Sequence, residues 1–386
     1  MTAERYQVVI VGAGLVGAAA ALALGRQGLR VALIERQLPA VPTDVWDIRI
    51  YAISPASQRF LERIGAWQYL DSSRIQPVFR MDVAGDMSGA IRLDAYESGV
   101  SHLAAIIESG RLQHALWQAL QTDGNVELLC PAEIASLDWG TPYSTLKLSD
   151  GKQLETELVV GADGAASRVR EWAGVGSTIT PYDQVGVVAN FECERPHRGT
   201  AFQWFSDSNI LAWLPLSGNC MSMVWSTQSA HADELLALDP GTLAVQVQQA
   251  GQNRLDVLRL LAPAAAFPLR LLKVQTSVAP GVALIGDAAH GVHPLAGQGV
   301  NLGFGDAEVL AATLGQQHRR TRCGDVRVLN AYARQRAEPV QRMQALTHGL
   351  HYLFAGERAA WLRNAGMQCV NQLPPLKAVM VREAMS

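Results

Sequence analysis

The sequence predicts an α/β protein, α+β overall, in which a domain built on a parallel sheet carries an inserted antiparallel sheet and a helical C-terminal region. Three observations support this fold class. A glycine-rich turn joins an apolar strand to a helix near the N-terminus. Alternating apolar residues between 182 and 225 indicate antiparallel strands. Apolar residues at helical spacing mark the C-terminal tail.

Composition limits the class of protein. The chain has 386 residues, 49% hydrophobic and 17% charged, which is typical of a globular protein with two domains and an appendage. A net charge of −3 argues against a nucleic-acid binder. The five cysteines lack the spacing of a zinc site or a disulfide framework, which favours a reducing cytoplasm. We see no signal peptide and no apolar run long enough to span a membrane.

The first elements form a βαβ unit. Val8–Val11 is an apolar strand, Ala18–Leu24 is rich in helix-forming alanine and leucine, and Val31–Ile34 is the next strand. Further along, we expect a helix from Arg111 capped by Ser109, a hairpin around Asp150–Gly151 and a strand at Leu158–Val160. Residues 232–261 are expected to be helical. A strand at Val282–Ile285 and a helix to about Leu314 follow.

The first motif that indicates chemistry is the glycine turn of residues 12–17. Gly12 permits a tight turn, Gly14 lets the backbone approach a pyrophosphate, and Gly17 lets the helix pack closely on the strand. The helix N-terminus offers free N–H groups to that pyrophosphate. Glu35 ends the second strand, where an acid accepts hydrogen bonds from a ribose diol. The turn therefore predicts dinucleotide binding, without separating NAD from FAD.

Two further glycine motifs follow strands. In residues 161–170, Asp163 and Gly164 suit a turn and Ser167 suits a helix cap; alone, this is also the pattern of an ordinary strand-to-helix turn. In residues 286–303, Gly286 and Asp287 end a strand, and an aspartate there can accept hydrogen bonds from a polyol. The helix that begins at Gly297–Gly299 would direct free N–H groups at a flavin edge and favour its anionic reduced form.

His290 and His293 are three residues apart, as metal ligands can be. No third ligand is evident and Pro294 indicates an irregular loop, so we predict no metal site. A hydrogen-bonding, substrate-facing or purely structural His290 remains open.

The three motifs in this order resemble the p-hydroxybenzoate hydroxylase type of flavoprotein monooxygenase. Within that group the chain is most similar to the ubiquinone-biosynthesis hydroxylases, through residues 47–57, 293–303 and 332–336. One difference is Gly305, which precedes Asp306 where the family usually has arginine.

The resemblance implies a Rossmann-like FAD-binding domain with an inserted substrate domain. The FAD contacts it implies, with those predicted above, are Gly12, Gly14, Gly17, Glu35, Arg36, Arg49, Arg111, Asp163, Gly286, Asp287, Gly297, Gly299, Val300 and Asn301. Arg49 and Arg111 would suit a pyrophosphate, although ordinary surface ion pairs are the alternative. The predicted catalytic segment comprises His290, Pro294, Gly297, Gln298 and Gly299.

The implied reaction is hydroxylation of an aromatic ring, with a polyprenylphenol of ubiquinone biosynthesis as the expected substrate. FAD reduced by NAD(P)H or by a partner reductase would react with O2 to give a flavin hydroperoxide, which attacks the ring. Tyr182 and His290 are the candidate bases. The alternatives are an FAD-dependent reductase or dehydrogenase of another substrate, or a non-catalytic dinucleotide-binding subunit of a biosynthetic complex.

We predict that residues 1–74, 101–176 and 271–340 form the FAD-binding domain, 75–100 and 177–270 the substrate domain, and 341–386 a helical region. The helical region would dock on the protein or a second subunit, or contact a membrane peripherally. We therefore expect a cytoplasmic protein, peripheral to the inner membrane, in a homo-oligomer or biosynthetic complex. Five aromatic residues would form core or line the pocket: Phe202, Trp204, Phe205, Trp213 and Trp225.

Overall fold

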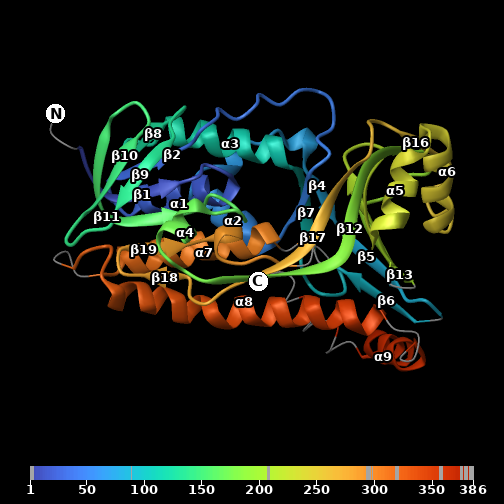
Figure 1. The fold of residues 1–386 in the computed structure, drawn as a ribbon. Coiled ribbons are helices and arrows are strands. Elements are labelled where there is room, and N and C mark those ends of the chain that lie inside the picture. The colour runs from blue at the N-terminus through green and yellow to red at the C-terminus, as the bar shows by residue number, and fades with distance from the viewer. Residues whose placement is uncertain are drawn as a thin grey trace.

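The computed structural model describes residues 4–87, 89–206, 209–292, 297, 299–317, 321–355, 360–373, 377 and 381. Within these residues the strands form two large sheets and one small sheet, and helices cover the large sheets (Figure 1). The predicted α/β fold class, with an inserted antiparallel sheet and a helical tail, is confirmed.

The first large sheet is parallel at its centre. β1 (Glu4–Val11) lies between β2 (Val31–Ile34) and β11 (Gln153–Gly161), with β8 (Val126–Leu129) beyond β2 and β19 (Val282–Leu284) beyond β11. The antiparallel additions are β9 (Ile134–Asp138), β10 (Ser144–Leu148) and β18 (Val278–Ala279). Because parallel strands end at the same edge, the segments after β1, β2, β11 and β19 gather there.

Helices α1 (Leu15–Arg26), α3 (Ser109–Gln121) and α7 (Gly299–Gly315) pack an apolar core against this sheet. α2 (Pro55–Arg63) contacts α7, and α4 (Arg168–Trp172) follows β11. The predicted cap of α3 is wrong: the N-cap is Glu108 rather than Ser109. The Glu108 side chain makes no capping hydrogen bond because it binds two arginines, described below.

A small sheet connects the two large ones. It consists of β3 (Ile50–Ile53), β7 (Ala104–Glu108) and β4 (Gln76–Val78), with the short 3-10 helices η1 (Trp67–Tyr69) and η2 (Ser72–Arg74) nearby in the chain. Its apolar side chains pack against strands of the second large sheet.

The second large sheet contains the predicted antiparallel strands. β12 (Ser177–Cys193), β15 (Cys220–Gln228), β14 (Asn209–Leu216) and β13 (Thr200–Ser206) are neighbours in that order. β5 (Arg80–Ala84) and β6 (Ala90–Asp94) extend one edge, while β16 (Leu258–Leu260) and β17 (Ala265–Val274) pair with β12. β12 and β17 are long enough to run between the two large sheets (Figure 1).

The prediction of continuous helix over 232–261 is wrong. The chain forms α5 (Ser229–Ala237) and α6 (Pro240–Ala250), separated at Asp239, whose side chain caps α6. After α6, positive φ angles at Gln252, Asn253 and Asp256 turn the chain away from helix. Leu258–Leu260 then adds to the edge of β12 as β16.

The tail is helical, as predicted. α8 (Val326–Ala355) runs along one side of the molecule, past α7 and the long strands, and α9 (Ala360–Gln372) packs against β6 (Figure 1). The predicted domain boundary between residues 270 and 271 falls inside β17, and the division into domains remains a proposal. No helix in the described part of the chain is both long and apolar enough to cross a membrane.

Candidate cofactor and active site

The turn between β1 and α1 presents an open helix N-terminus. Gly14 is the N-cap of α1 and no side chain caps it. A Cβ atom added at Gly14 would meet nothing within 4 Å, whereas one at Gly17 would lie 1.9 Å from the Gly12 carbonyl oxygen. Gly17 thus serves close packing, and Gly14 borders free space in front of the helix.

Glu35 braces this turn. Its Oε2 accepts a hydrogen bond from the Ala13 N–H (2.8 Å), and its Oε1 accepts from the N–H groups of Arg36 (2.7 Å) and Gln37 (3.3 Å). A carboxylate has about four acceptor positions, so Glu35 retains capacity for a ribose hydroxyl. The Arg36 side chain is exposed.

The second motif places Asp163 at the start of α4. Its Oδ2 accepts from the N–H groups of Arg168 (2.8 Å) and Val169 (3.1 Å). Its Oδ1 is buried and has no hydrogen-bond partner among the described residues. A buried acceptor without a partner is costly, so this oxygen is suited to a ligand donor.

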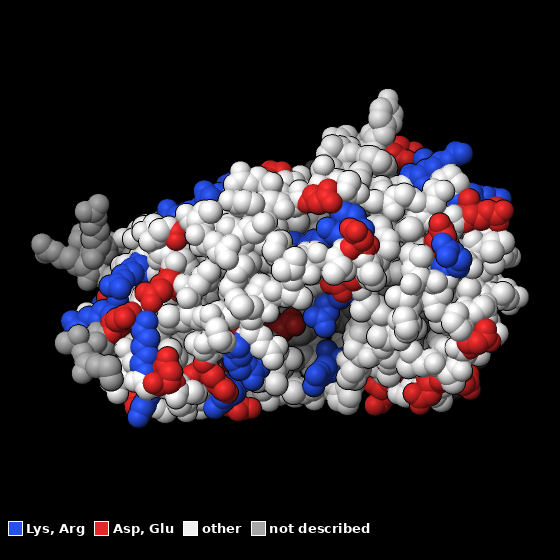
Figure 2. All heavy atoms as spheres, turned by 90° about the horizontal axis from the view of Figure 1, so that it is seen from above, with Lys and Arg blue, Asp and Glu red and all other residues white. Residues whose placement is uncertain are grey.

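The third motif begins directly after β19, in the 3-10 helix η3 (Gly286–Ala288). Asp287 is solvent-accessible, yet surrounding protein desolvates its carboxyl group and raises its pKa, against the opposing effect of His290 and Arg49. Solvent reaches the Asp287 carboxyl group, but protein surrounds it on most sides, so it lies in a concave part of the surface. Figure 2 shows a hollow near the middle of one face, with basic side chains around a recessed acidic one.

The N-terminus of α7 is anchored by Asn301. Its Oδ1 accepts from the Ser54 N–H (3.0 Å), and its Nδ2 donates to the Ala52 carbonyl (2.8 Å). The Asn301 side chain therefore ties α7 to the end of β3. For binding a cofactor, the start of α7 offers its backbone N–H groups. Gly297 adopts a φ of +60° beside Ala52. Pro294 and Gln298 lie outside the described residues.

Comparison with known proteins identifies the family and its cofactor. A family model described as an FAD binding domain matches residues 5–347. The chain belongs to this FAD-binding family. The open Gly14 turn, the unpartnered Asp163 oxygen and the accessible Asp287 fit such a cofactor. FAD would supply electron transfer to O2 when bound.

Curated relatives match most of the chain. The 3-demethoxyubiquinol 3-hydroxylase of Escherichia coli (strain K12) is 37% identical over 316 residues, or 81% of both chains. The ubiquinone hydroxylase UbiL of Rhodospirillum rubrum is 35% identical, covering 98% of this chain and 89% of its own. The mitochondrial ubiquinone biosynthesis monooxygenase COQ6 of Homo sapiens is 32% identical, covering 96% and 91%.

Solved structures share the fold. The p-nitrophenol 4-monooxygenase PnpA of Pseudomonas putida DLL-E4 superposes with a TM-score of 0.79 at 18% identity, covering 100% of this chain and 99% of its own. Klebsiella pneumoniae HpxO, solved with FAD and uric acid, gives 0.75 at 18% identity, covering 99% and 97%. The curated relatives place this chain among the FAD-dependent monooxygenases, which confirms the predicted enzyme class.

The two predicted arginines have different surroundings in this FAD-binding protein. Arg111 Nε donates to Glu108 (2.8 Å), a buried carboxylate that also binds Arg74 through two hydrogen bonds. The Arg49 guanidinium is exposed and makes no ion pair with any described residue. Of these two arginines, Arg111 is therefore held in an ion pair, whereas Arg49 is not paired with any described residue.

His290 is turned inward. Its side chain is 6% exposed and its Nε2 lies 2.6 Å from Asp306 Oδ2. This contact favours a role in positioning over one as a catalytic base. The other candidate base, Tyr182, lies with its hydroxyl 3.5 Å from His348 Nδ1 on α8. No cluster of three potential metal ligands occurs within the part of the chain that the structure describes.

Sequence reasoning missed a residue that connects the second and third FAD motifs. The buried Arg170 donates from Nη2 to the Ala165 carbonyl (2.8 Å) and from Nη1 to the Ala288 carbonyl (2.9 Å). An arginine at a fixed place in the motif was visible in the sequence, but its second partner comes from a distant segment.

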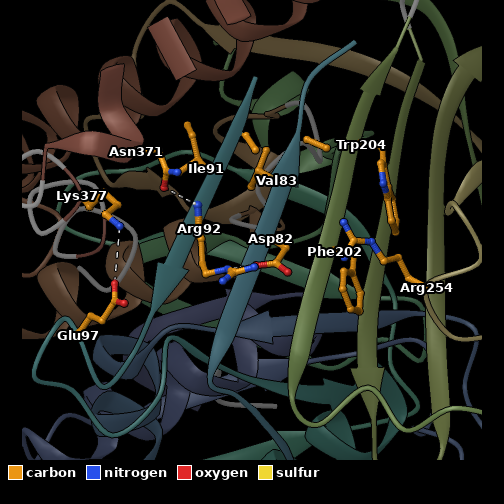
Figure 3. Close-up of a pocket in the computed structure, with 12 residues that line it drawn as sticks. Asp82, Val83, Ile91, Arg92, Glu97, Phe202, Trp204, Arg254, Asn371 and Lys377 are labelled. Atoms are coloured by element: carbon orange, nitrogen blue, oxygen red, sulfur yellow. Dashed lines mark hydrogen bonds and ion pairs between the residues drawn. The ribbon is translucent and has the colours of Figure 1, made fainter. Parts of the chain in front are cut away.

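A pocket of about 430 Å³ lies apart from the FAD-binding segments, at the edge formed by β5, β6, β13 and the C-terminal region (Figure 3). Phe202 and Trp204 stack there with ring centroids 5.8 Å apart. Trp204 also packs in the core under α5 and α6 with Trp213 and Trp225, and Phe205 packs with α9. Core packing thus accounts for most of the predicted aromatic set, and a pocket beside the flavin lined by these residues remains a prediction.

Proposed function

We propose that this protein is an FAD-dependent monooxygenase that hydroxylates the aromatic ring of a prenylated phenol in ubiquinone biosynthesis. The observation that carries the proposal is the 35% identity to the ubiquinone hydroxylase UbiL over 98% of the chain. Two further relatives have names from the same pathway. NAD(P)H or a partner reductase supplies electrons, and O2 supplies the oxygen atom.

The residues of this chain bind and orient in the proposed reaction. The N–H groups at the start of α1 bind the pyrophosphate, and Glu35 accepts from the ribose. Asp287 accepts from the ribityl chain. The N-terminus of α7 stabilises negative charge on the reduced flavin, because the helix dipole is positive at that end.

We further propose that the substrate ring lies between the flavin and the face of the second large sheet that carries Asn190 and Ser222. These two residues are opposite each other in the pairing of β12 with β15. Asn190 Oδ1 and Ser222 Oγ are buried without a hydrogen-bond partner among the described residues. Asn190 Nδ2 donates to the Asp47 carbonyl (2.9 Å), so this face is turned toward the FAD-binding side. Unpartnered polar groups there are suited to a phenolic hydroxyl.

The test uses the FAD-reconstituted protein with NAD(P)H, a short-chain prenylphenol and isotopically labelled O2. We expect the product to gain one labelled oxygen atom on the ring, measured by mass spectrometry. The Asp287→Asn variant, in which an NH2 donor replaces one acceptor oxygen and the negative charge is lost, should bind FAD less tightly. FAD-loaded protein that consumes NAD(P)H but releases only hydrogen peroxide with every prenylphenol would overturn the substrate assignment.

A peripheral membrane contact remains a proposal as well. α8 exposes Leu346 and Leu353, at 53% and 40% exposure. α9, in contrast, is docked on the protein through β6. The proposed oligomer or biosynthetic complex rests on the names of the relatives' pathway alone.

A further inference from the structure

A buried carboxylate connects α7, α8 and the turn after β19. Asp306 on α7 is 1% exposed. Its Oδ2 accepts from the Gly286 N–H (2.9 Å) and from His290 Nε2 (2.6 Å), and its Oδ1 accepts from Arg336 Nε on α8 (2.6 Å). The Asp306 side chain thus binds both ends of the segment from Gly286 to His290, which begins with the proposed FAD contacts Gly286 and Asp287.

The position of Arg336 depends on Gly305. Arg336 is 8% exposed, and its Nη2 donates to the Leu302 carbonyl (2.9 Å). A Cβ atom at Gly305 would lie 3.0 Å from Arg336 Nη1. The glycine that precedes Asp306 therefore leaves the space that the guanidinium occupies.

The same segment is held at two more points from within the protein. Gln344, also on α8, donates to the Leu272 carbonyl (3.0 Å) and to the Gly291 carbonyl (3.2 Å). Arg170 donates to the Ala288 carbonyl (2.9 Å). Between these contacts, Asp287 is directed to solvent. The interior contacts thus define where the Asp287 carboxylate lies.

Charge balance gives Arg336 a second role. Because an ionised carboxylate only accepts hydrogen bonds, His290 Nε2 carries the proton in its contact with Asp306. Burial alone would raise the pKa of Asp306, but His290 and Arg336 outweigh it and lower that pKa. The permanent charge of Arg336 balances the buried Asp306 carboxylate.

We propose that Arg336 is a positioning residue for FAD: through Asp306 it fixes Gly286 and His290, and thereby the Asp287 carboxylate, while its charge compensates the buried Asp306 carboxylate. This inference rests on the proposed cofactor role of Asp287 and deepens it. The charged and titratable groups around the Asp306–His290 pair come from four elements, and they are Asp287 in η3, Lys273 in β17, Arg170 in α4, and Tyr332 and Arg336 in α8.

The experiment measures the dissociation constant of FAD by fluorescence titration of the apoprotein. Arg336→Gln removes the permanent cation beside Asp306. FAD binding should weaken by roughly tenfold or more, because an uncompensated buried carboxylate is costly and Asp306 then no longer holds Gly286 and His290 in place.

Two controls separate charge from packing. Arg336→Lys keeps the positive charge, so its loss of FAD affinity should be clearly smaller than that of Arg336→Gln. Arg334→Gln removes an exposed arginine from the same helix and should leave FAD binding unchanged.

A double variant keeps the test decisive if Arg336→Gln alone does not fold. Arg336→Gln with Asp306→Asn removes both charges, and we expect it to fold and to bind FAD within roughly tenfold of the wild type. Equal weakening in Arg336→Gln and Arg336→Lys would overturn the proposal, as would affinities within twofold of the wild type in both variants. Because FAD binding is the readout, failure here is distinguishable from failure to hydroxylate a phenol.

Discussion

At the scale of single residues, similar side chains in one motif have different tasks, set by their neighbours. Gly17 and Gly14 belong to one motif, yet Gly17 is packed against a carbonyl oxygen whereas Gly14 borders free space. Arg49 and Arg111 were predicted as a pair, yet Arg111 is held by Glu108. What touches a residue, rather than its type, decides whether it remains free for FAD.

This contrast leads to a prediction for the glycine turn. Gly14→Ala should change the stability of the apoprotein by about 1 kcal/mol or less but weaken FAD binding roughly tenfold or more, because the methyl group occupies the path of the pyrophosphate. Gly17→Ala should cost about 2–3 kcal/mol of folding stability, because its Cβ collides with the Gly12 carbonyl. Thermal unfolding and FAD titration measure the two effects. The same loss of stability in both variants would contradict the assignment.

At the scale of elements, α9 is attached to the hairpin of β5 and β6 by asparagine side chains. Asn364 accepts from the Gly89 N–H (2.8 Å) and the Met87 N–H (3.3 Å), and donates to Asp86 Oδ1 (2.6 Å). Asn371, nearer the end of the helix, accepts one hydrogen bond, from the Arg92 N–H (3.1 Å). The helix therefore docks on its own chain mainly near its start.

The attachment predicts unequal effects of two matched substitutions in α9. Asn364→Ala leaves buried backbone N–H groups without partners and should cost about 1–3 kcal/mol of unfolding free energy. Asn371→Ala removes an exposed hydrogen bond and should cost about 0.5–1 kcal/mol. Urea unfolding midpoints compare the two. Indistinguishable midpoints would show that apolar packing of α9, and not Asn364, holds the helix in place.

At the scale of the whole molecule, the proposed FAD contacts come from segments spread between Gly12 and Asn301. They meet because the strands before them end at one edge of a sheet and α7 begins beside that edge. A ligand that joins such distant segments stabilises the fold as a unit, since it binds the folded chain and not the unfolded one.

Removal of FAD should accordingly lower the melting temperature of the entire protein. With free FAD at about 100 times its dissociation constant, the stabilisation is about 2.7 kcal/mol. Calorimetry of holoprotein and apoprotein measures the shift, and riboflavin, which lacks the pyrophosphate and adenylate, serves as the control ligand. A melting temperature independent of FAD would argue against a cofactor site built from these segments.

Much of the FAD-binding half could be predicted from the sequence, because its signals are local. A strand, a glycine turn and a helix in succession define the path of the chain through the conformations that neighbouring residues allow. The failures arose where tertiary contacts decide: residues 258–260 have no strong local signal, and they form β16 because β12 offers an edge. The N-cap of α3 is Glu108, whose carboxylate is bound by Arg111 in the first turn and by the more distant Arg74.

The sequence by itself determined the fold class, the order of the three glycine motifs and the enzyme class. The tertiary structure alone decided which side chains meet: Arg170 with Ala288, and Arg336 with Asp306 over Gly305. Backbone conformation follows from adjacent residues, whereas the partner of a buried charge depends on how helices and strands far apart in the chain pack together.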